Sequence, residues 1–579
     1  MRSAALAVAA VAAAAALATS AAAPAQRYDV LIAQGTIYDG SGSAPFVGDV
    51  AIKGDRIVYV GPRARGSATR LIDASGKAVS PGFINMLSQA QEALLVDGRG
   101  QSDLRQGVTL EVMGEGESMG PVNRTMKKLG EQRETDIKYK IDWATLGQYL
   151  EKIEKQGISP NVASFIGAAT PRIYVLGEHD VQPTPEQLAK MQTLVHQAME
   201  EGAMGVASAL IYAPGTYAKT PEIIALASEA AKCGGMYISH MRNEGNHVLD
   251  GVDELIEISE KSGAPAEIYH MKVGGKPNWS KLSPMIAKVE AARAAGHRIT
   301  ANMYVYEAGA TGLDAAMPPW VQNGGLEAWI GRLKDPAIRK RVAAEMRNPN
   351  TAWDNLYALA GPHGTLMLSF KNPKLKPLTG KRLDEIAVMR HESPEDAAID
   401  LVIEDGSRVG VAYFLMSDDN IEREIALPYT SFDSDESAQA PEGVFLKSST
   451  HPRAYGNFAR VLAKYVRDEK VIPLATAVHK LTELPASNLS LHDRGMLKAG
   501  DYADVVVFDP ATIQDHATYD HPQVFATGVS EVFVNGIEAL RNGEPTGAHS
   551  GRFVRGRAWT GWPDGSCRKS AADWQWAKN

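Results

Sequence analysis

The middle of the chain alternates short runs rich in β-branched residues with amphipathic stretches of twelve or more residues. Strands that alternate with helical patterns are typical of βα units, whose strands pair in parallel. Eight such units predict an α/β fold with a closed (β/α)8 TIM barrel, and an open doubly wound sheet is the alternative. The predicted strands are Gly82–Ile84, Val108–Met113, Val162–Ile166, Met204–Ser208, Met236–Ser239, Ala266–Tyr269, Arg298–Met303 and Tyr429–Phe432. The clearest helical runs are Pro185–Glu201, Pro221–Lys232, Val248–Ser262 and Ser283–Ala295.

Both ends of the chain are rich in short alternating strands, among them Tyr28–Ala33 and Val529–Val534. The dipeptide Gly54-Asp55 between two such runs is a hairpin signal. We expect one small β-sandwich assembled from both ends. The interval 312–428 is too long for a single βα loop, so it predicts an inserted lid over the barrel mouth. The predicted organisation is a leader at 1–25, sandwich segments at 26–80 and 486–556, a barrel at 81–485, and a Trp-rich tail at 557–579 without an assigned function.

Charge and cysteine content restrict the kind of ligand. The chain has 60 basic and 68 acidic residues and a formal net charge of -8, so it lacks the cationic surplus that nucleic acid or an anionic membrane requires. A small-molecule substrate is expected. Cys233 and Cys567 are the only cysteines, too few for a disulfide-stapled scaffold or a Cys-rich zinc module. A metal site must therefore use His, Asp and Glu.

The N-terminal segment resembles a secretory signal. Met1–Ala25 has a single Arg2, an apolar run of Ala, Val and Leu, and small residues before candidate cleavage points near Ala22 or Ala25. No later stretch reaches the roughly eighteen apolar residues that a membrane helix needs. We therefore expect a periplasmic or secreted protein without a membrane span.

Chemically active residues are expected where barrel strands end. His240 and His270 close two successive predicted strands, and neutral imidazoles at such positions can converge on one metal ion. Glu115 follows the second strand and Asp435 follows the eighth, so each carboxylate is a candidate ligand or general base. Two neighbouring acids, Glu117 and Asp433, remain open as alternatives.

At these residues the chain resembles the metal-dependent amidohydrolase superfamily, and within it the D-aminoacylase branch. The resemblance covers nearly everything from Tyr28 to about Gly556. It rests on several separate motifs in the family's order: Gly76–Ile84, Ser239–Gly245, His270–Lys272, Tyr304–Gly309, Ala440–Gly443, His451–Gly456, Asp493–Gly495 and Gly500–Asp509.

Two departures from that family pattern concern the metal site. The family places His-x-His after the first barrel strand, whereas this chain has Leu87 and Gln89. The branch carries a cysteine after the second strand, and here Gly116 stands opposite it, which leaves a neighbouring carboxylate as the ligand. The fourth-strand stretch 203–210 has no lysine that could be carboxylated. The resemblance therefore implies one divalent ion per chain, expected to be zinc, held by Glu115, His240 and His270.

The implied activity is hydrolysis of the amide bond in a small N-acyl amino acid, expected to be an N-acyl-D-amino acid, or in a dipeptide-like substrate. Asp435 would shuttle the proton. Tyr304 or Tyr306 would help to stabilise the developing oxyanion, and Lys272 and Arg453 are candidate clamps for the substrate carboxylate. The alternatives are a degenerate relative that binds such ligands without turnover, and a hydrolase of esters, lactones or cyclic amides.

Overall fold

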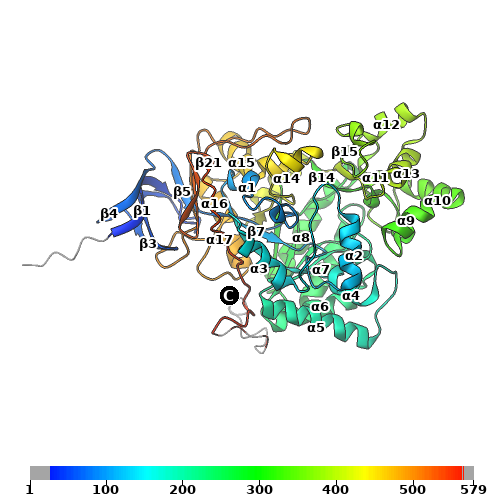
Figure 1. The fold of residues 1–579 in the computed structure, drawn as a ribbon, viewed down its shortest axis with the longest axis horizontal. Coiled ribbons are helices and arrows are strands. Elements are labelled where there is room, and N and C mark those ends of the chain that lie inside the picture. Colours follow the sequence, from blue (N-terminus) through cyan, green and yellow to red (C-terminus); the bar gives the residue numbers. More distant parts are fainter. Residues whose placement is uncertain (1–26, 564, 566, 568–579) are drawn as a thin grey trace, which may run out of the picture.

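The computed structural model describes residues 27–563, 565 and 567. The predicted leader and the last tryptophans of the tail, Trp574 and Trp576, lie outside these residues. Figure 1 shows the strands of the two chain ends gathered at one end of the molecule and helices of the interval 312–428 at the other.

Strands from the two chain ends form one nine-stranded sheet. Within it, β5 pairs antiparallel with β18 and so joins the N-terminal strands to the C-terminal ones. The predicted hairpin at Gly54-Asp55 connects β2 and β3. Assembly from both ends is thus observed, whereas the sandwich form remains a prediction. The strands are β1 (Arg27–Ile37), β2 (Phe46–Lys53), β3 (Arg56–Gly61), β4 (Ser67–Asp73), β5 (Ala78–Pro81), β18 (Val505–Phe508), β19 (Val529–Val534), β20 (Ile537–Arg541) and β21 (Glu544–Pro545).

The middle of the chain contains a strand at each of the eight predicted positions, and all of them pair in parallel. They form a three-stranded sheet, β6-β7-β8, and a six-stranded sheet, β17-β13-β12-β11-β10-β9. Beyond the ladders, Met86 N donates to Phe432 O over 3.3 Å, between the segments of β6 and β17. The strands are β6 (Phe83–Asn85), β7 (Val108–Met113), β8 (Asn161–Ser164) with β9 (Ile166–Gly167), β10 (Gly205–Ala209), β11 (Met236–His240), β12 (Ala266–Ile268), β13 (Ile299–Met303) and β17 (Thr430–Phe432).

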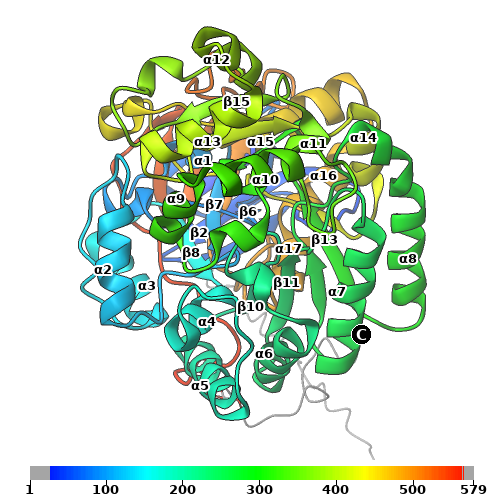
Figure 2. The ribbon, with the colours of Figure 1, turned by 90° about the vertical axis from the view of Figure 1, so that its right-hand side faces the viewer.

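Amphipathic helices connect these strands and cover them from outside (Figure 2). The helix at Pro185 begins with a capping box, in which Thr184 and Gln187 bond to each other's backbone amides, and it ends at Gly202 in the left-handed region. Such start and stop signals explain why the predicted helical runs match the structure closely. The helices are α4 (Ala169–Leu176), α5 (Pro185–Glu201), α6 (Thr220–Lys232), α7 (Val248–Ser262) and α8 (Leu282–Ala294).

The interval between β13 and β17 has a sheet of its own, in which β16 lies between β14 and β15 with antiparallel pairing. We call residues 312–428 the inserted segment. Its strands and those beside it are β14 (Ala308–Gly312), β15 (Thr365–Ser369) and β16 (Gly410–Phe414). Its helices are α9 (Leu326–Leu333), α10 (Pro336–Met346), α11 (Leu356–Ala360), α12 (Leu383–Arg390), α13 (Pro394–Asp405) and α14 (Asp418–Ala426).

Helices outside these two groups are α1 (Gln101–Leu104), α2 (Arg124–Arg133), α3 (Leu146–Gln156), α15 (Arg453–Arg460), α16 (Leu474–Leu481) and α17 (Glu483–Asn488). Near the end of the chain, Cys567 forms a disulfide with Cys233, which follows α6, and Trp562 packs against Trp559. The described part of the tail therefore docks on the body. None of the helices between residues 27 and 563 has the length and apolarity to cross a membrane.

Candidate metal centre

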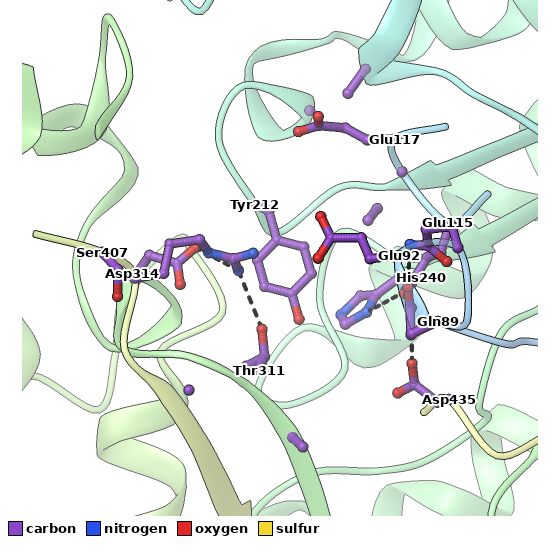
Figure 3. Close-up of a pocket in the computed structure, with 18 of the residues that line it drawn as sticks. Gln89, Glu92, Glu115, Glu117, Tyr212, His240, Thr311, Asp314, Ser407 and Asp435 are labelled. Atoms are coloured by element: carbon purple, nitrogen blue, oxygen red, sulfur yellow. Dashed lines mark hydrogen bonds and ion pairs between the residues drawn. The ribbon is translucent and has the colours of Figure 1, made fainter. Parts of the chain in front are cut away.

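A cavity of about 920 Å³ lies between the carboxyl ends of the parallel strands and the inserted segment. Its lining includes Glu115, His240 and His270 from the strand side and Arg408 and Asp314 from the inserted segment. Figure 3 shows a close-up of this cavity. The carboxyl ends of parallel strands are where side chains from distant parts of an α/β chain converge, so this cavity is the candidate active site.

Three side chains that the sequence singles out converge in the cavity. His240 is the last residue of β11, His270 follows β12, and Glu115 follows β7. The Glu115 Oε1 atom lies 3.3 Å from His240 Nδ1 and 3.0 Å from His270 Nε2. One ligand atom from each of the three side chains lies within 4.8 Å of the others. One carboxylate and two imidazoles at this spacing form a donor set that suits a zinc-type ion.

The turn before Glu115 requires glycine. Gly114 has a φ of +106°, and a Cβ atom there would lie 2.3 Å from the carbonyl oxygen of Phe165. A side chain at position 114 would clash with that oxygen, so the position requires glycine. The chain leaves the extended conformation of β7 at Gly114, and the next residue, Glu115, lies beside the two histidines. The competing acid, Glu117, is exposed and is not part of the three-residue cluster. The structure therefore favours Glu115.

Glu244 is a buried carboxylate on the other side of the two histidines, and its role is not predicted from the sequence. It lies 3.4 Å from His240 Nε2, 3.3 Å from His270 Nδ1 and 2.7 Å from Lys272 Nζ. A carboxylate on the second nitrogen of an imidazole orients the ring and increases its basicity as a ligand. Its spacing, four residues after His240 in a loop that follows a strand, is the sequence signal that could have identified it.

Charge pairing sets the electrostatics of this cluster. Burial alone would raise the pKa of Glu115, but hydrogen bonds and charge interactions with His240 and His270 lower it well below its ordinary value. Burial also opposes the charged form of Glu244, and the positive groups of His240, Lys272 and His270 nevertheless lower its pKa to about 2. Burial and Lys272 act to lower the pKa of His270, but Glu244 and Glu115 raise it to about 10. The two carboxylates are therefore anionic and hold His270 protonated, so a metal ion bound here would replace that proton.

Gln89 joins the cluster to the candidate general base. Its Nε2 donates to Glu115 Oε2 over 2.8 Å and to Asp435 Oδ1 over 3.2 Å (Figure 3). Its Oε1 accepts from Gln91 Nε2 over 3.2 Å, so the three partners together define the orientation of the amide. This glutamine thus holds the metal-ligand carboxylate and Asp435 at a fixed separation. The other departure from the family pattern, Leu87, is fully buried.

Asp435 and Arg453 form an ion pair beside the cluster. Arg453 Nη2 lies 2.9 Å from Asp435 Oδ2 and donates to the Asp435 carbonyl oxygen over 2.6 Å. The Nε and Nη1 atoms of Arg453 are buried and have no hydrogen-bond partner among the described residues, and the same is true of the Tyr304 hydroxyl. Buried donors without partners mark the place of a ligand acceptor, so these groups fit a substrate carboxylate or carbonyl. The alternative acid Asp433 does not line the cavity.

Two predicted substrate-binding residues need correction. Tyr306 does not line the cavity. Its ring packs instead against His451 and Tyr519, with centroid separations of 5.4 and 6.4 Å. The strand β13 ends at Met303, so the period-two alternation that would have placed Tyr304 and Tyr306 on one side is lost. Lys272 does line the cavity, but its ammonium group already donates to Glu244 Oε2 and His270 O, and it lies 2.7 Å from His270 Nδ1. It holds the cluster and leaves Arg453 as the better-placed clamp.

The inserted segment adds a cation to the far wall of the cavity. Arg408 pairs with Asp314 at 2.8 Å and lies over the ring of Tyr212, whose other neighbour is His240 at 5.3 Å between ring centroids. Figure 3 shows Tyr212 between His240 and Asp314. The order of residues does not reveal this contact, because only tertiary packing brings Arg408 next to Tyr212.

Comparisons with known proteins agree with this arrangement. A profile of the amidohydrolase family matches residues 448–538. The D-aminoacylase of Alcaligenes xylosoxydans xylosoxydans is 31% identical over 531 residues, which cover 91% of this chain and 98% of that protein. A solved D-aminoacylase is 32% identical, with a TM-score of 0.74, and the match covers 91% of this chain and all of that one. That protein has a binuclear metal centre, in which one metal activates and the second attenuates. The N-acyl-D-glutamate deacylase of Bordetella bronchiseptica, solved with zinc and a phosphonate mimic of the tetrahedral intermediate, is 28% identical with a TM-score of 0.76 over 92% of this chain and all of that one.

Proposed function

The chain belongs to the D-aminoacylase branch of the amidohydrolase superfamily, and from that premise we propose that it hydrolyses the amide bond of N-acyl-D-amino acids with a single divalent ion. It is a metal-dependent amidohydrolase. The observation that carries the proposal is the convergence of Glu115, His240 and His270 next to the Asp435–Arg453 pair, in a cavity at the ends of the parallel strands. Together these groups provide a cation site, a proton acceptor and an anion clamp.

The donor set fits a zinc ion. The fit rests on geometry, because Glu115 Oε1 lies within 3.3 Å of one nitrogen of each imidazole and Glu244 lies within 3.4 Å of the opposite nitrogens. A divalent ion bound there would supply Lewis acidity, which lowers the pKa of water to about 7 and polarises a carbonyl. Three protein ligands with an open fourth position are the usual arrangement for a catalytic zinc.

We propose one ion rather than two. A second ion needs further ligands where the family pattern has His-x-His, and this chain has the buried Leu87 and the amide of Gln89 there. The Gln89 amide directs its NH2 group, a donor without metal affinity, at both Glu115 and Asp435. These hydrogen bonds occupy the space between the two carboxylates that a second cation would otherwise bridge.

The residues of the chain have separable roles in the proposed reaction. Asp435 accepts the proton of the attacking water and returns it to the nitrogen of the leaving amine. Arg453 binds the α-carboxylate of the amino acid through its free donors, which fixes the amide next to Asp435. The buried Tyr304 hydroxyl is free to donate to the oxygen that becomes negatively charged. Lys272, which pairs with Glu244, holds the imidazole of His270 in position, and Glu244 lies 3.4 Å from His240 Nε2.

Three further expectations accompany this function as proposals. The two parallel sheets form one closed (β/α)8 barrel, which is supported by the hydrogen bond from Met86 to Phe432. The inserted segment acts as a lid, which is supported by its contribution to the cavity wall. The mature chain is exported, which is supported by the Cys233–Cys567 disulfide, since disulfides persist in oxidising compartments. Cell fractionation with N-terminal sequencing tests the last proposal, and a cytoplasmic protein that keeps Arg2 would refute it.

Release of free amino acid from matched N-acetyl-D- and N-acetyl-L-amino acids tests the proposed reaction. The zinc-loaded protein should release the D-amino acid at least about a hundred times faster than the L-enantiomer, because the clamp, metal and base fix the amide in one orientation. Equal rates for both enantiomers would contradict the assignment of substrate stereochemistry. No release from any acylated amino acid would contradict the proposed reaction itself.

A further inference from the structure

The candidate active-site cavity is large for a small acylated amino acid. At about 920 Å³ it lies near the upper end of the range of roughly 300–1,000 Å³ that encloses drug-sized ligands. An N-acetyl amino acid would leave much of this volume empty. The part of the substrate that fills the remainder should match the side chains that line it.

One side of the cavity is an apolar wall built from the segment after β7. It consists of Met119, Val122, Met126, Leu129 and Ile141, which all line the cavity and are all only partly buried. Two of them, Met126 and Leu129, are three residues apart on one face of α2. None of the side chains of α2 is fully buried, so this helix leaves its apolar face turned to the cavity.

Helix α2 is anchored over the cavity at its C-terminal end. Arg133 pairs with Glu178 at 2.7 Å and with Glu327 of α9 at 2.9 Å. Lys371 of the inserted segment donates to the Gln132 carbonyl oxygen over 2.9 Å. These polar contacts hold the helix in place without covering Met126 and Leu129, so the apolar face is available to a ligand.

The arrangement of the catalytic groups indicates which part of the substrate meets this wall. Arg453 and Asp435 hold the amino-acid portion, because Arg453 binds its carboxylate and Asp435 protonates its nitrogen. These residues lie beyond β17, whereas the wall follows β7 and reaches the loop near α4. With the scissile carbonyl at Glu115, His240 and His270, the acyl group leaves that carbonyl on the side away from the nitrogen, and the wall that begins four residues after Glu115 is the apolar surface next to it.

Charged groups of both signs line the cavity next to the wall. The Glu92 carboxylate accepts a hydrogen bond of 2.9 Å from Tyr139, and Glu117 (Figure 3) interacts electrostatically with Arg408 and Arg133. These charges already have groups of opposite sign or hydrogen-bond donors nearby, and the wall itself offers no charged group to an ionic acyl chain. Methionine side chains adapt to apolar chains of different shape. The wall therefore suits an uncharged, flexible aliphatic chain.

We propose that the natural substrates carry an acyl chain substantially longer than acetyl, of about six to ten carbons, which binds against Met119, Val122, Met126, Leu129 and Ile141. This inference rests on the proposed function, because it assigns one side of the same active site to the acyl group.

The test measures kcat/KM for N-acetyl-, N-hexanoyl- and N-octanoyl-D-leucine with the zinc-loaded protein. Each methylene that becomes buried favours the longer chain by up to a factor of about three to four, so the octanoyl-to-acetyl ratio should be at least about ten. Met126→Glu places a charge in the wall and should lower this ratio to near one, and Leu129→Asp provides a second variant. Met389→Glu makes the same substitution at an exposed position of α12, outside the cavity, and should keep the wild-type ratio.

The outcomes separate the two claims. A wild-type ratio of about ten or more that falls in both wall variants, with folding confirmed by circular dichroism, supports the acyl-chain site. Hydrolysis of the acetyl substrate with a ratio near one in the wild type would overturn the acyl-chain site and leave the proposed function intact. A high ratio that both wall variants retain would also overturn it, because the chain would then bind elsewhere. Absence of hydrolysis with every substrate would overturn both.

Discussion

Replacing Asp435 by asparagine removes the proposed proton acceptor with little change in shape. Asp435 has a φ of +44°, a left-handed conformation that Asn adopts as readily as Asp, so the backbone can stay in place. The carboxylate accepts from Gln89 at 3.2 Å and from Arg453 at 2.9 Å, whereas the amide can satisfy only one of these donors. The main-chain carbonyl of residue 435 continues to hold Arg453.

The expected loss follows from these contacts. A general base contributes roughly 10²–10⁴ to the rate, so kcat for an N-acyl-D-amino acid should fall by at least about a hundredfold. Because Arg453 keeps its backbone contact and Glu115, His240 and His270 are unchanged, KM and the zinc content should change by less than about threefold. Steady-state kinetics on purified protein of measured metal content provides both values.

Asp433→Asn is the matched control. Asp433 is two residues away, fully buried and outside the cavity, and burial followed by the charge of Asp435 raises its pKa well above the ordinary value. An amide replaces a neutral acid there with little cost, so Asp433→Asn should retain most of the activity. If Asp435→Asn hydrolyses substrate at the parental rate while Asp433→Asn is inactive, the assignment of the base is wrong. If both variants remain active, the proposed proton transfer has no support.

Three further predictions address the ligands, the clamp and the fold. Glu115→Gln should lose most of the bound zinc, measured by elemental analysis, because a neutral amide replaces the carboxylate that both histidines face; unchanged zinc would exclude Glu115 as a ligand. Arg453→Lys should raise KM at least about tenfold, since an ammonium lacks the guanidinium fork, and an equal effect on a substrate without an α-carboxylate would rule out the clamp. Burial lowers the pKa of Lys480 to about 7, so between about pH 7 and 10.5 the unfolded chain binds a proton that the folded protein does not, and the stability rises with pH. Lys480→Met should therefore raise the melting temperature at pH 7 and flatten this pH dependence. A lower melting temperature would contradict the prediction.

The central strands could be predicted because each is a short β-branched run between amphipathic stretches. The structure places a strand at every one of the eight positions, and two helices, α5 and α7, have the predicted bounds. The strand ends in turn mark His240, His270 and Glu115 as candidates, because the carboxyl ends of parallel strands meet at the same end of the sheet. The two histidines could thus be paired without tertiary contacts, whereas the choice of Glu115 over Glu117 needed the structure.

Other features of the site depend on contacts that the order of residues does not reveal. The sequence shows that Gln89 replaces a family histidine, but its hydrogen bond to Asp435 joins residues 346 positions apart. The role of Lys272 depends on Glu244, whose charge only the folded structure brings to 2.7 Å. The choice between Tyr304 and Tyr306 depends on the path of the chain after Met303, where β13 ends, and only the folded structure shows it.

The most direct test of the central claim is a zinc titration of chelator-treated protein, followed by the rate of hydrolysis of an N-acyl-D-amino acid. If Glu115, His240 and His270 hold the only catalytic ion, the rate should rise linearly and reach a plateau at one equivalent of zinc per chain. A plateau at two equivalents would contradict the single-ion site, and a protein that stays inactive at every zinc concentration would contradict the proposed reaction.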